Sequence, residues 1–262
     1  MVFDGGLLPA GGQHYAVPEG SEFSHLIAGT FALPGGDAAL PLLPSPCAVL
    51  LFRPTGKALL CGPMTTLRQL RSGDGLYGVH LRCGCGDWVW DGSMTELTDR
   101  VVPLEPLFPG SDKLGAALRR CTSLTEQNAL FARLATVHGA RNYQSAALLR
   151  RCVALIGQQR GQVRVAELAQ SVGCSERHLN RLMHQKVGLA TKTVCQLQQL
   201  HDSLRTMLTA PSRSLLLLAV NCGYFDQAHM NRQYRQFLGC SAGDVRRSGT
   251  LPAGRDIAEL TE

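Results

Sequence analysis

Arginine, asparagine, glutamine and histidine side chains gather in one short stretch near the end of the chain. Residues 223 to 241 read GYFDQAHMNRQYRQFLGCS. Met230, Tyr234 and Phe237 recur at helical spacing, which leaves Arg232 and Arg235 on the opposite side of the same helix. Arginine, asparagine and glutamine make paired hydrogen bonds with purine edges in the major groove of DNA. The stretch therefore predicts an amphipathic helix whose polar face can contact bases.

An earlier segment repeats this arrangement. The pattern Leu-Ala-x-x-x-Gly ends at Gly173 and again at Gly223, and each copy continues to a second glycine, Gly188 or Gly239. The interval between glycines is 15 residues in the first copy and 16 in the second, so the second turn has one additional residue. Each copy predicts a helix, a turn at glycine and a second helix with a polar outer face, which is a helix-turn-helix.

The repeat also aligns the caps and faces of the two second helices. Ser175 and Asp226 are expected to cap them. In the first copy, the inner stripe is Leu179, Leu182 and Met183, and the outer face holds Arg177, Arg181 and His184.

Between the copies, the segment TKTVCQLQQLHDSLRTMLTA predicts one longer helix. Its apolar stripe consists of Val194, Leu197, Leu200, Leu204, Met207 and Leu208, and Pro211 is expected to end it. Roughly 18 residues span about 27 Å, which is close to one turn of DNA. The spacing suits two reading helices in successive segments of the major groove.

Charge divides the chain at about the same place. Residues 1 to 140 carry 10 Lys and Arg against 12 Asp and Glu, whereas residues 141 to 250 carry 15 against 5. A basic segment beside a nearly neutral one predicts that only the basic segment meets a polyanion. We expect two domains, 1–138 and 142–250, in an α+β protein.

The segments VAELAQSVGCSERHLNRLMHQKVG and LAVNCGYFDQAHMNRQYRQFLGCSAGDVRR resemble the two helix-turn-helix halves of AraC-type (AraC/XylS) transcriptional regulators. The resemblance covers about residues 142 to 248. It implies that the DNA base-reading residues are Arg177, Asn180 and Arg181 in the first half and Gln227, His229 and Arg232 in the second. We expect the DNA backbone to be contacted by Lys192, Arg235, Arg246 and Arg247.

Several positions depart from the family pattern. Thr191 and Ala242 stand where a proline is usual after each terminal glycine, Gln199 replaces a common arginine, and Leu217 replaces a polar residue. These changes bear on packing and on the approach to phosphate, and so on affinity more than on fold.

The first half of the chain predicts a small β-rich domain. Short apolar runs broken by proline and glycine, namely HLIAGTFAL, CAVLLF, KALLC and YGVHL, are typical of strands. The segment DKLGAALRRCTSLTEQNALFARLATV then predicts one or two amphipathic helices. By resemblance, such a barrel-like β domain senses a small-molecule effector, the helices after it dimerise, and RNA polymerase is a further partner.

His80, Cys83 and Cys85 form one cluster of ligand types, in HLRCGCGDW. A structural zinc site needs four ligands and this cluster offers three, so we expect strand and turn residues and no metal or cofactor. The ten cysteines are expected to stay reduced, most of them as small core residues. Trp88 and Trp90 are expected to alternate on a strand.

Composition narrows the class of protein further. No apolar run reaches the roughly 18 residues of a membrane span, and MVFDGGLLPAGG lacks the features of a secretory signal, so we expect a cytoplasmic protein. The resemblance to AraC-type regulators implies that the protein is not an enzyme. Two alternatives stay open. One is a DNA-repair methyl-acceptor enzyme joined to the same DNA-binding module, although this chain lacks its compact four-cysteine cluster. The other is an architectural DNA-binding protein without an effector.

Overall fold

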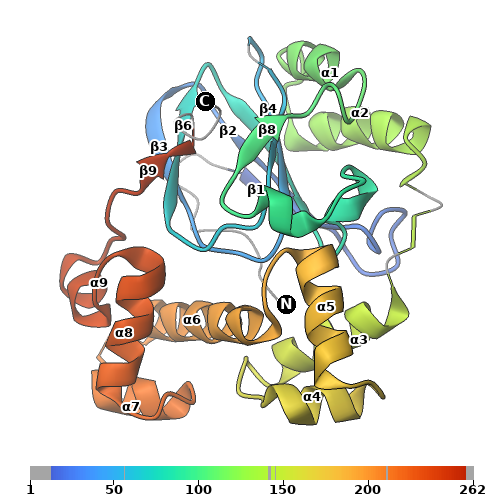
Figure 1. Ribbon diagram of the computed structural model, residues 1–262. Helices are drawn as coiled ribbons and strands as arrows, with labels where there is room; N and C mark the ends of the chain where they lie inside the picture. The colour runs from blue at the N-terminus through green and yellow to red at the C-terminus, as the bar shows by residue number, and fades with distance from the viewer. Residues whose placement is uncertain (1–12, 56, 141–142, 145, 211, 258–262) are drawn as a thin grey trace.

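The computed structural model describes residues 13–55, 57–140, 143–144, 146–210 and 212–257. It contains strand-rich sheets in the first part of the chain and a helical region in the last part, as the sequence predicts (Figure 1). Among the described residues, no helix combines the length and the apolar character needed to cross a membrane.

Two sheets and two helices form the first part. The strands are β1 (Gln13–Ala16), β2 (Ile27–Leu33), β3 (Gly36–Leu42), β4 (Val49–Phe52), β5 (Leu59–Cys61), β6 (Arg68–Gly73), β7 (Leu76–Leu81), β8 (Val101–Pro103) and β9 (Arg255–Asp256). One sheet has the order β1-β2-β7-β4-β5-β8 and the other the order β3-β6-β9. The pairs are antiparallel except β6 with β9.

Strand β4 shows how the six-stranded sheet can be buried on both faces. Val49 and Leu51 point into the core between the two sheets, together with Phe31. Leu50 and Phe52 point the other way, into a core shared with α1 (Ser111–Leu118) and α2 (Leu124–Val137). Because successive side chains of a strand point to opposite faces, an unbroken apolar run here marks a strand covered on both sides.

The strand and helix predictions for this part are confirmed, with one exception. The first three apolar runs contain β2, β4 and β5, and the fourth covers all of β7 except Leu76. The amphipathic segment forms the two helices α1 and α2. The prediction that Trp88 and Trp90 alternate on a strand is wrong. Trp88 ends a short 3-10 helix, η1 (Gly86–Trp88), and Trp90 follows it, because the chain turns at Gly84 after β7 and the indole of Trp90 donates to the Ser93 carbonyl.

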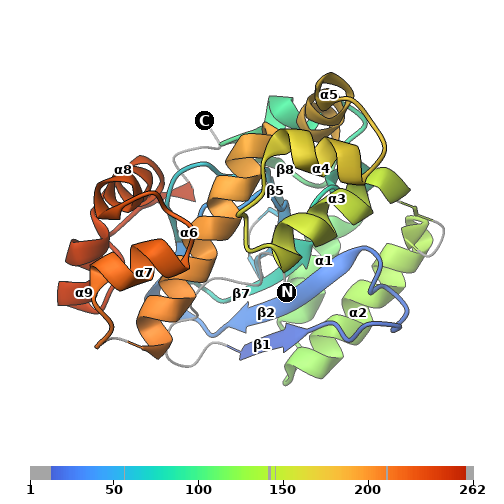
Figure 2. The same ribbon diagram turned by 90° about the horizontal axis from the view of Figure 1, so that it is seen from below.

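The second part consists of helices around one core. They are α3 (Ala147–Gln158), α4 (Val165–Ser171), α5 (Glu176–Val187), α6 (Thr191–Thr209), α7 (Leu215–Asn221), α8 (Gln227–Leu238) and α9 (Ala242–Ser248). Helix α6 runs between α3, α4 and α5 on one side and α7, α8 and α9 on the other (Figure 2). The predicted stripe of α6 is buried except at Leu208, which is 44% exposed in the last turn. The predicted stop at Pro211 lies outside the described residues.

The two parts pack directly on each other. Cys47, Leu67 and Cys83 of the first part belong to the same core as the helices. The Leu67 N–H donates to the Phe237 carbonyl at 2.9 Å, and the imidazole of His201 donates to the Pro44 carbonyl at 2.7 Å. The chain then returns from α9 to the first part as strand β9. The division into domains 1–138 and 142–250 stays a prediction.

Candidate nucleic-acid interface

Each helix-turn-helix copy has the same frame. Helices α4 and α7 are followed by Gly173 and Gly223, both in the left-handed region at φ 74° and 73°. Helix α5 begins after Ser175, whose hydroxyl accepts from the His178 N–H, and α8 begins after Asp226, whose carboxylate accepts from the His229 N–H. These caps satisfy N–H groups that a helix start leaves free, so the sequence itself fixes where both helices begin.

An asparagine joins each second helix to the element that follows it. The amide oxygen of Asn180 accepts from the Thr191 N–H at 3.3 Å, at the start of α6. In the second copy, the amide oxygen of Asn231 accepts from the Ala242 N–H at 3.1 Å, at the start of α9. Each asparagine lies five residues after its helix cap. This contact gives Asn180 a positioning role, and its role as a base-reading residue stays a prediction.

A buried polar network fixes the second copy against α6. The Ser203 hydroxyl lies 2.9 Å from the Tyr234 hydroxyl and 3.2 Å from the Tyr224 hydroxyl. Burial raises the pKa values of both tyrosines well above their usual range, so the hydroxyls keep their protons. Gln199 donates to the Cys222 carbonyl at 2.9 Å and accepts from Gln233 at 3.3 Å. The residue that departs from the family pattern at 199 therefore packs inside the protein.

The outer faces carry the arginines that the sequence singles out. Arg177, Arg181 and Arg232 are exposed, and Arg181 and Arg232 both lie six residues after the helix cap. Arg181 donates to Nδ1 of His178 at 3.3 Å, which holds its guanidinium over the first turn of α5. Gln227 is half-buried at the first position of α8.

His229 is held by the turn before its helix. Its Nδ1 accepts from the Phe225 N–H at 3.3 Å, and its ring meets the Tyr224 ring edge-on at 5.6 Å between centroids. When the ring is neutral, its proton is therefore on Nε2. In the predicted base contact, His229 would therefore donate a hydrogen bond from Nε2.

The four residues predicted to contact the DNA backbone are exposed, and two of them already make contacts within the protein. Arg246 donates to the Arg213 carbonyl at 3.3 Å, and Arg247 forms an ion pair with Asp244. Hydrogen bonds from Ser241, first from its hydroxyl and then from its backbone N–H, lower the pKa of Asp244. Lys192 lies in the first turn of α6 and Arg235 in the last turn of α8.

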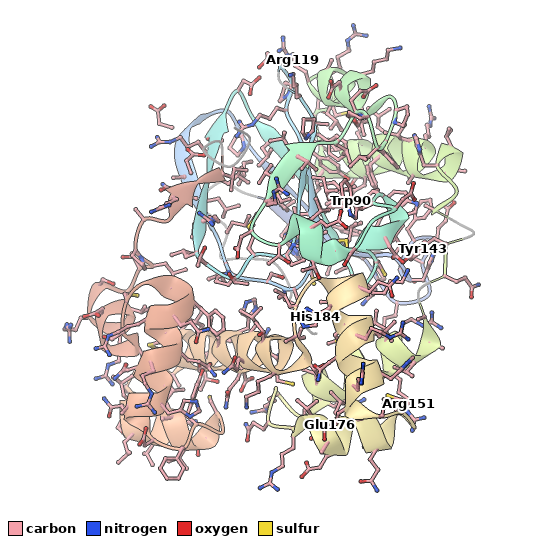
Figure 3. The ribbon with its side chains drawn as sticks, viewed as in Figure 1. Trp90, Arg119, Tyr143, Arg151, Glu176 and His184 are labelled. Carbon is pink, nitrogen blue, oxygen red and sulfur yellow. The ribbon has the colours of Figure 1, made fainter. Side chains whose placement is uncertain are left out.

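Both second helices point their C-terminal ends at the β part. Thr95 donates to the His184 carbonyl at 2.8 Å and Thr98 to the Gly188 carbonyl at 2.9 Å, at the end of α5. The end of α8 accepts from Leu67 in the same way. In Figure 3, His184 lies beside the β part and Glu176, at the start of α5, lies far from it. The N-terminal halves of α5 and α8 therefore face away from the sheets (Figure 1).

This frame is matched by a known protein family. A family model described as a helix-turn-helix domain matches residues 168–248. Residues 168–248 are an AraC-type helix-turn-helix domain. The chain thus carries the DNA-binding domain of a transcription regulator. The match begins at Leu168, within α4, and leaves residues 142–167 of the predicted domain outside it.

Several solved structures resemble parts of this chain. The C-terminal domain of AraT, a response regulator from Geobacillus stearothermophilus, is similar at 19% identity and a TM-score of 0.38, over 45% of this chain and 93% of that chain. ToxT from Vibrio cholerae is similar at 8% identity and a TM-score of 0.45, over 83% of this chain and 95% of that chain. ToxT with bound unsaturated fatty acid is similar at 9% identity and a TM-score of 0.42, over 85% and 93%. No curated protein matches.

The cluster of His80, Cys83 and Cys85 is divided among three environments. Cys83 packs in the core of the AraC-type domain and Cys85 in the core of the six-stranded sheet. The ring of His80 lies tilted against the ring of Phe31, between the two sheets. Within the described part of the chain, no group of three or more His, Cys, Asp or Glu side chains is arranged to hold a metal ion. The ten cysteines are free thiols, and seven of them are buried.

Sequence reasoning missed the residues that attach the AraC-type domain to the β part. Lys186 forms an ion pair with Asp87 at 2.6 Å, although 99 residues separate them in the chain. No local pattern marks such a pair. The role of Asn231 could have been found, because the repeat aligns it with Asn180.

Proposed function

We propose that the protein is a sequence-specific, non-enzymatic transcription regulator in which α5 and α8 read two successive major-groove segments on one face of duplex DNA. The observation that carries this proposal is the equivalence of Arg181 and Arg232. Both are exposed at the same position of equivalent helices, whose N-terminal halves face away from the β part. In helix-turn-helix proteins, side chains from the N-terminal part of the second helix contact base edges.

The length of α6 supports the two-segment arrangement. Its 19 residues span about 28 Å at ~1.5 Å per residue. Successive major-groove segments lie roughly 34 Å apart on one face of the duplex. Ser203 and Gln199 bond the second copy to α6, and Asn180 bonds α5 to the start of α6, so both reading helices are attached to the same helix.

A selection from randomised DNA tests this function on the full chain. Arg181→Ala and Arg232→Ala should each cost about 1 to 3 kcal/mol on the preferred site and relax base preference at different positions, roughly ten base pairs apart. Arg119→Ala is the matched control, because it removes the same charge from an exposed position after α1 (Figure 3). Identical preferred sequences for the wild type and the reading variants would refute the proposal.

We also propose that the β part binds a small-molecule effector that carries an acidic group. A cavity of about 790 Å³ lies between β1, β2, the turn after β7 and helix α3. Its lining combines Val17 and Val153 with two arginines, Arg82 and Arg150, against one carboxylate, Glu19. An apolar cavity with a few charged groups is typical of ligand sites, and arginine side chains in such a lining can bind a carboxylate. Since α3 packs on α4 and α6, an occupant would touch both parts of the protein.

A thermal-shift measurement tests the effector on the full chain. Medium-chain carboxylates should raise the melting temperature more than the corresponding amides do, and Arg150→Gln should remove the difference. Arg151→Gln is the control, because Arg151 is the exposed next residue of α3 and is not among the lining residues (Figure 3). Equal shifts with carboxylates and amides would refute an acidic effector.

A further inference from the structure

The additional residue in the second turn is Phe225. From cap to C-terminal glycine, α5 spans Ser175 to Gly188 and α8 spans Asp226 to Gly239, an interval of 13 residues in both. Before the cap, the Cys174 N–H donates to the Ala169 carbonyl, and the Tyr224 N–H donates to the Ala219 carbonyl at the same spacing. Tyr224 therefore corresponds to Cys174. Phe225 has no counterpart in the first copy.

The backbone of Phe225 is fixed, whereas its side chain is in solvent. Its N–H donates to His229, whose own N–H donates to Asp226 at 2.5 Å. The Phe225 side chain is 89% exposed, which is the highest value among the large exposed apolar residues of the described chain. An aromatic ring this exposed to water gains free energy from any apolar group that covers it.

The position of Phe225 indicates what that group is. The residue directly precedes the cap of α8, at the end of the helix that faces away from the β part and that carries Gln227 and Arg232. In the major groove, the exposed apolar group of a base pair is the C5-methyl of thymine, and phenylalanine is among the residues that contact it. Phosphates and the other base edges in the groove are polar.

Resting on the proposed reading role of α8, we propose that Phe225 contacts the C5-methyl group of a thymine at the edge of the segment read by the second helix-turn-helix. The first helix-turn-helix has the shorter turn and a half-buried Cys174 at its end, so it makes no such contact. The longer turn thus makes the two half-sites unequal. The protein would then bind its site in one direction only.

Replacing thymine with deoxyuridine in the selected site removes this methyl group and nothing else. Binding by the full chain should weaken about fourfold at one thymine in the half-site of α8, as expected for one methyl-sized apolar group. Phe225→Ala should bind the thymine site about that much more weakly and should not discriminate between the two DNAs. Phe225→Leu should retain part of the difference, and Val137→Ala, which alters a residue 81% exposed on α2, should retain all of it.

The outcomes separate this inference from the proposed function. If Arg232→Ala relaxes base preference but Phe225→Ala shows the same deoxyuridine profile as the wild type, the thymine contact is overturned and the reading role of α8 stands. If that same Phe225→Ala protein also fails to retain RNA polymerase at the site, the ring belongs to a protein contact. If the wild type shows no base preference, the proposed function is refuted, and the thymine contact that rests on it is refuted as well.

Discussion

Replacing the glycines at the ends of α5 and α8 should measure how tightly the β part holds the first reading helix. Gly188 and Gly239 occupy equivalent positions at φ 83° and 76°. Alanine in this left-handed conformation costs about 1 to 2 kcal/mol at either position. At 188 the new methyl would also lie 2.6 Å from the Met94 carbonyl oxygen and 2.9 Å from the Thr98 hydroxyl, whereas at 239 it would meet no described atom within 4 Å.

The additional cost at 188 follows from what must move. To relieve the clash, η2 (Met94–Leu97) has to separate from α5, which breaks the hydrogen bonds that Thr95 and Thr98 donate to α5 carbonyls. Each bond contributes about 0.5 to 1.5 kcal/mol, so Gly188→Ala should destabilise the protein by about 1 to 3 kcal/mol more than Gly239→Ala does. Comparing the two alanine variants therefore separates the energy of the contact between η2 and α5 from the cost of backbone strain.

The assay is urea unfolding followed by tryptophan fluorescence. The chain has two tryptophans, Trp88 and Trp90, and η1, which contains Trp88, contacts α5, so the signal reports on this contact. The midpoint should fall for both variants and should fall further for Gly188→Ala. The midpoint of Thr98→Val, which removes one of the donors, should lie between the midpoints of the wild type and of Gly188→Ala. Equal midpoints for the two alanine variants would refute the packing of η2 on α5.

Three further predictions concern phosphate contact, the cysteines and pH. Arg246→Ala should weaken binding to all DNA sequences about equally and should reduce the salt slope by about one unit, measured by titration at several salt concentrations. Cys83→Ser combined with Cys85→Ser should leave DNA affinity unchanged in gel-shift titrations, and stoichiometric zinc that is lost in this variant would contradict the structural role of both residues. Burial, with a smaller contribution from His14, lowers the pKa of His80 to about 4. Between about pH 6.5 and pH 4, the unfolded chain therefore binds a proton at His80 that the folded protein does not. The urea midpoint should fall as pH decreases through this range, and His80→Asn should make it depend less on pH.

The AraC-type domain could be predicted from local patterns because its frame is local. The caps Ser175 and Asp226 and the terminal glycines Gly188 and Gly239 act within a few residues of themselves. Because the pattern is repeated, the caps and glycines of each copy could be compared with those of the other. For the same reason, Phe225 could be identified as an insertion once the bonds of Cys174 and Tyr224 had aligned the two turns.

Contacts between residues distant in sequence could not be predicted in this way. The Thr98 hydroxyl meets a carbonyl 90 residues later, and the pairing of Arg68 with Arg255 spans most of the chain. The base-reading assignment of Asn180 shows a second limit. Helical spacing places this residue at the edge of the outer face. A side-chain amide, however, can form a hydrogen bond equally well with a base edge or with a backbone N–H at the start of a neighbouring helix. Its hydrogen bond to Thr191 follows only from the path of the chain after Gly188.

Strand β9 gives the helical region a second attachment to the β part. Arg71 pairs with Asp256 at 3.0 Å, and Ile257 is buried between the two sheets. The helices are therefore tethered at both ends, once by the chain that leads into α3 and once by the tail after α9. Two tethers keep the local concentration of the β part near the reading helices high, which supports the shared core and the hydrogen bonds that hold the two parts together. A helical region that is attached at both ends, and packed on the β part between them, cannot swing away about a single hinge.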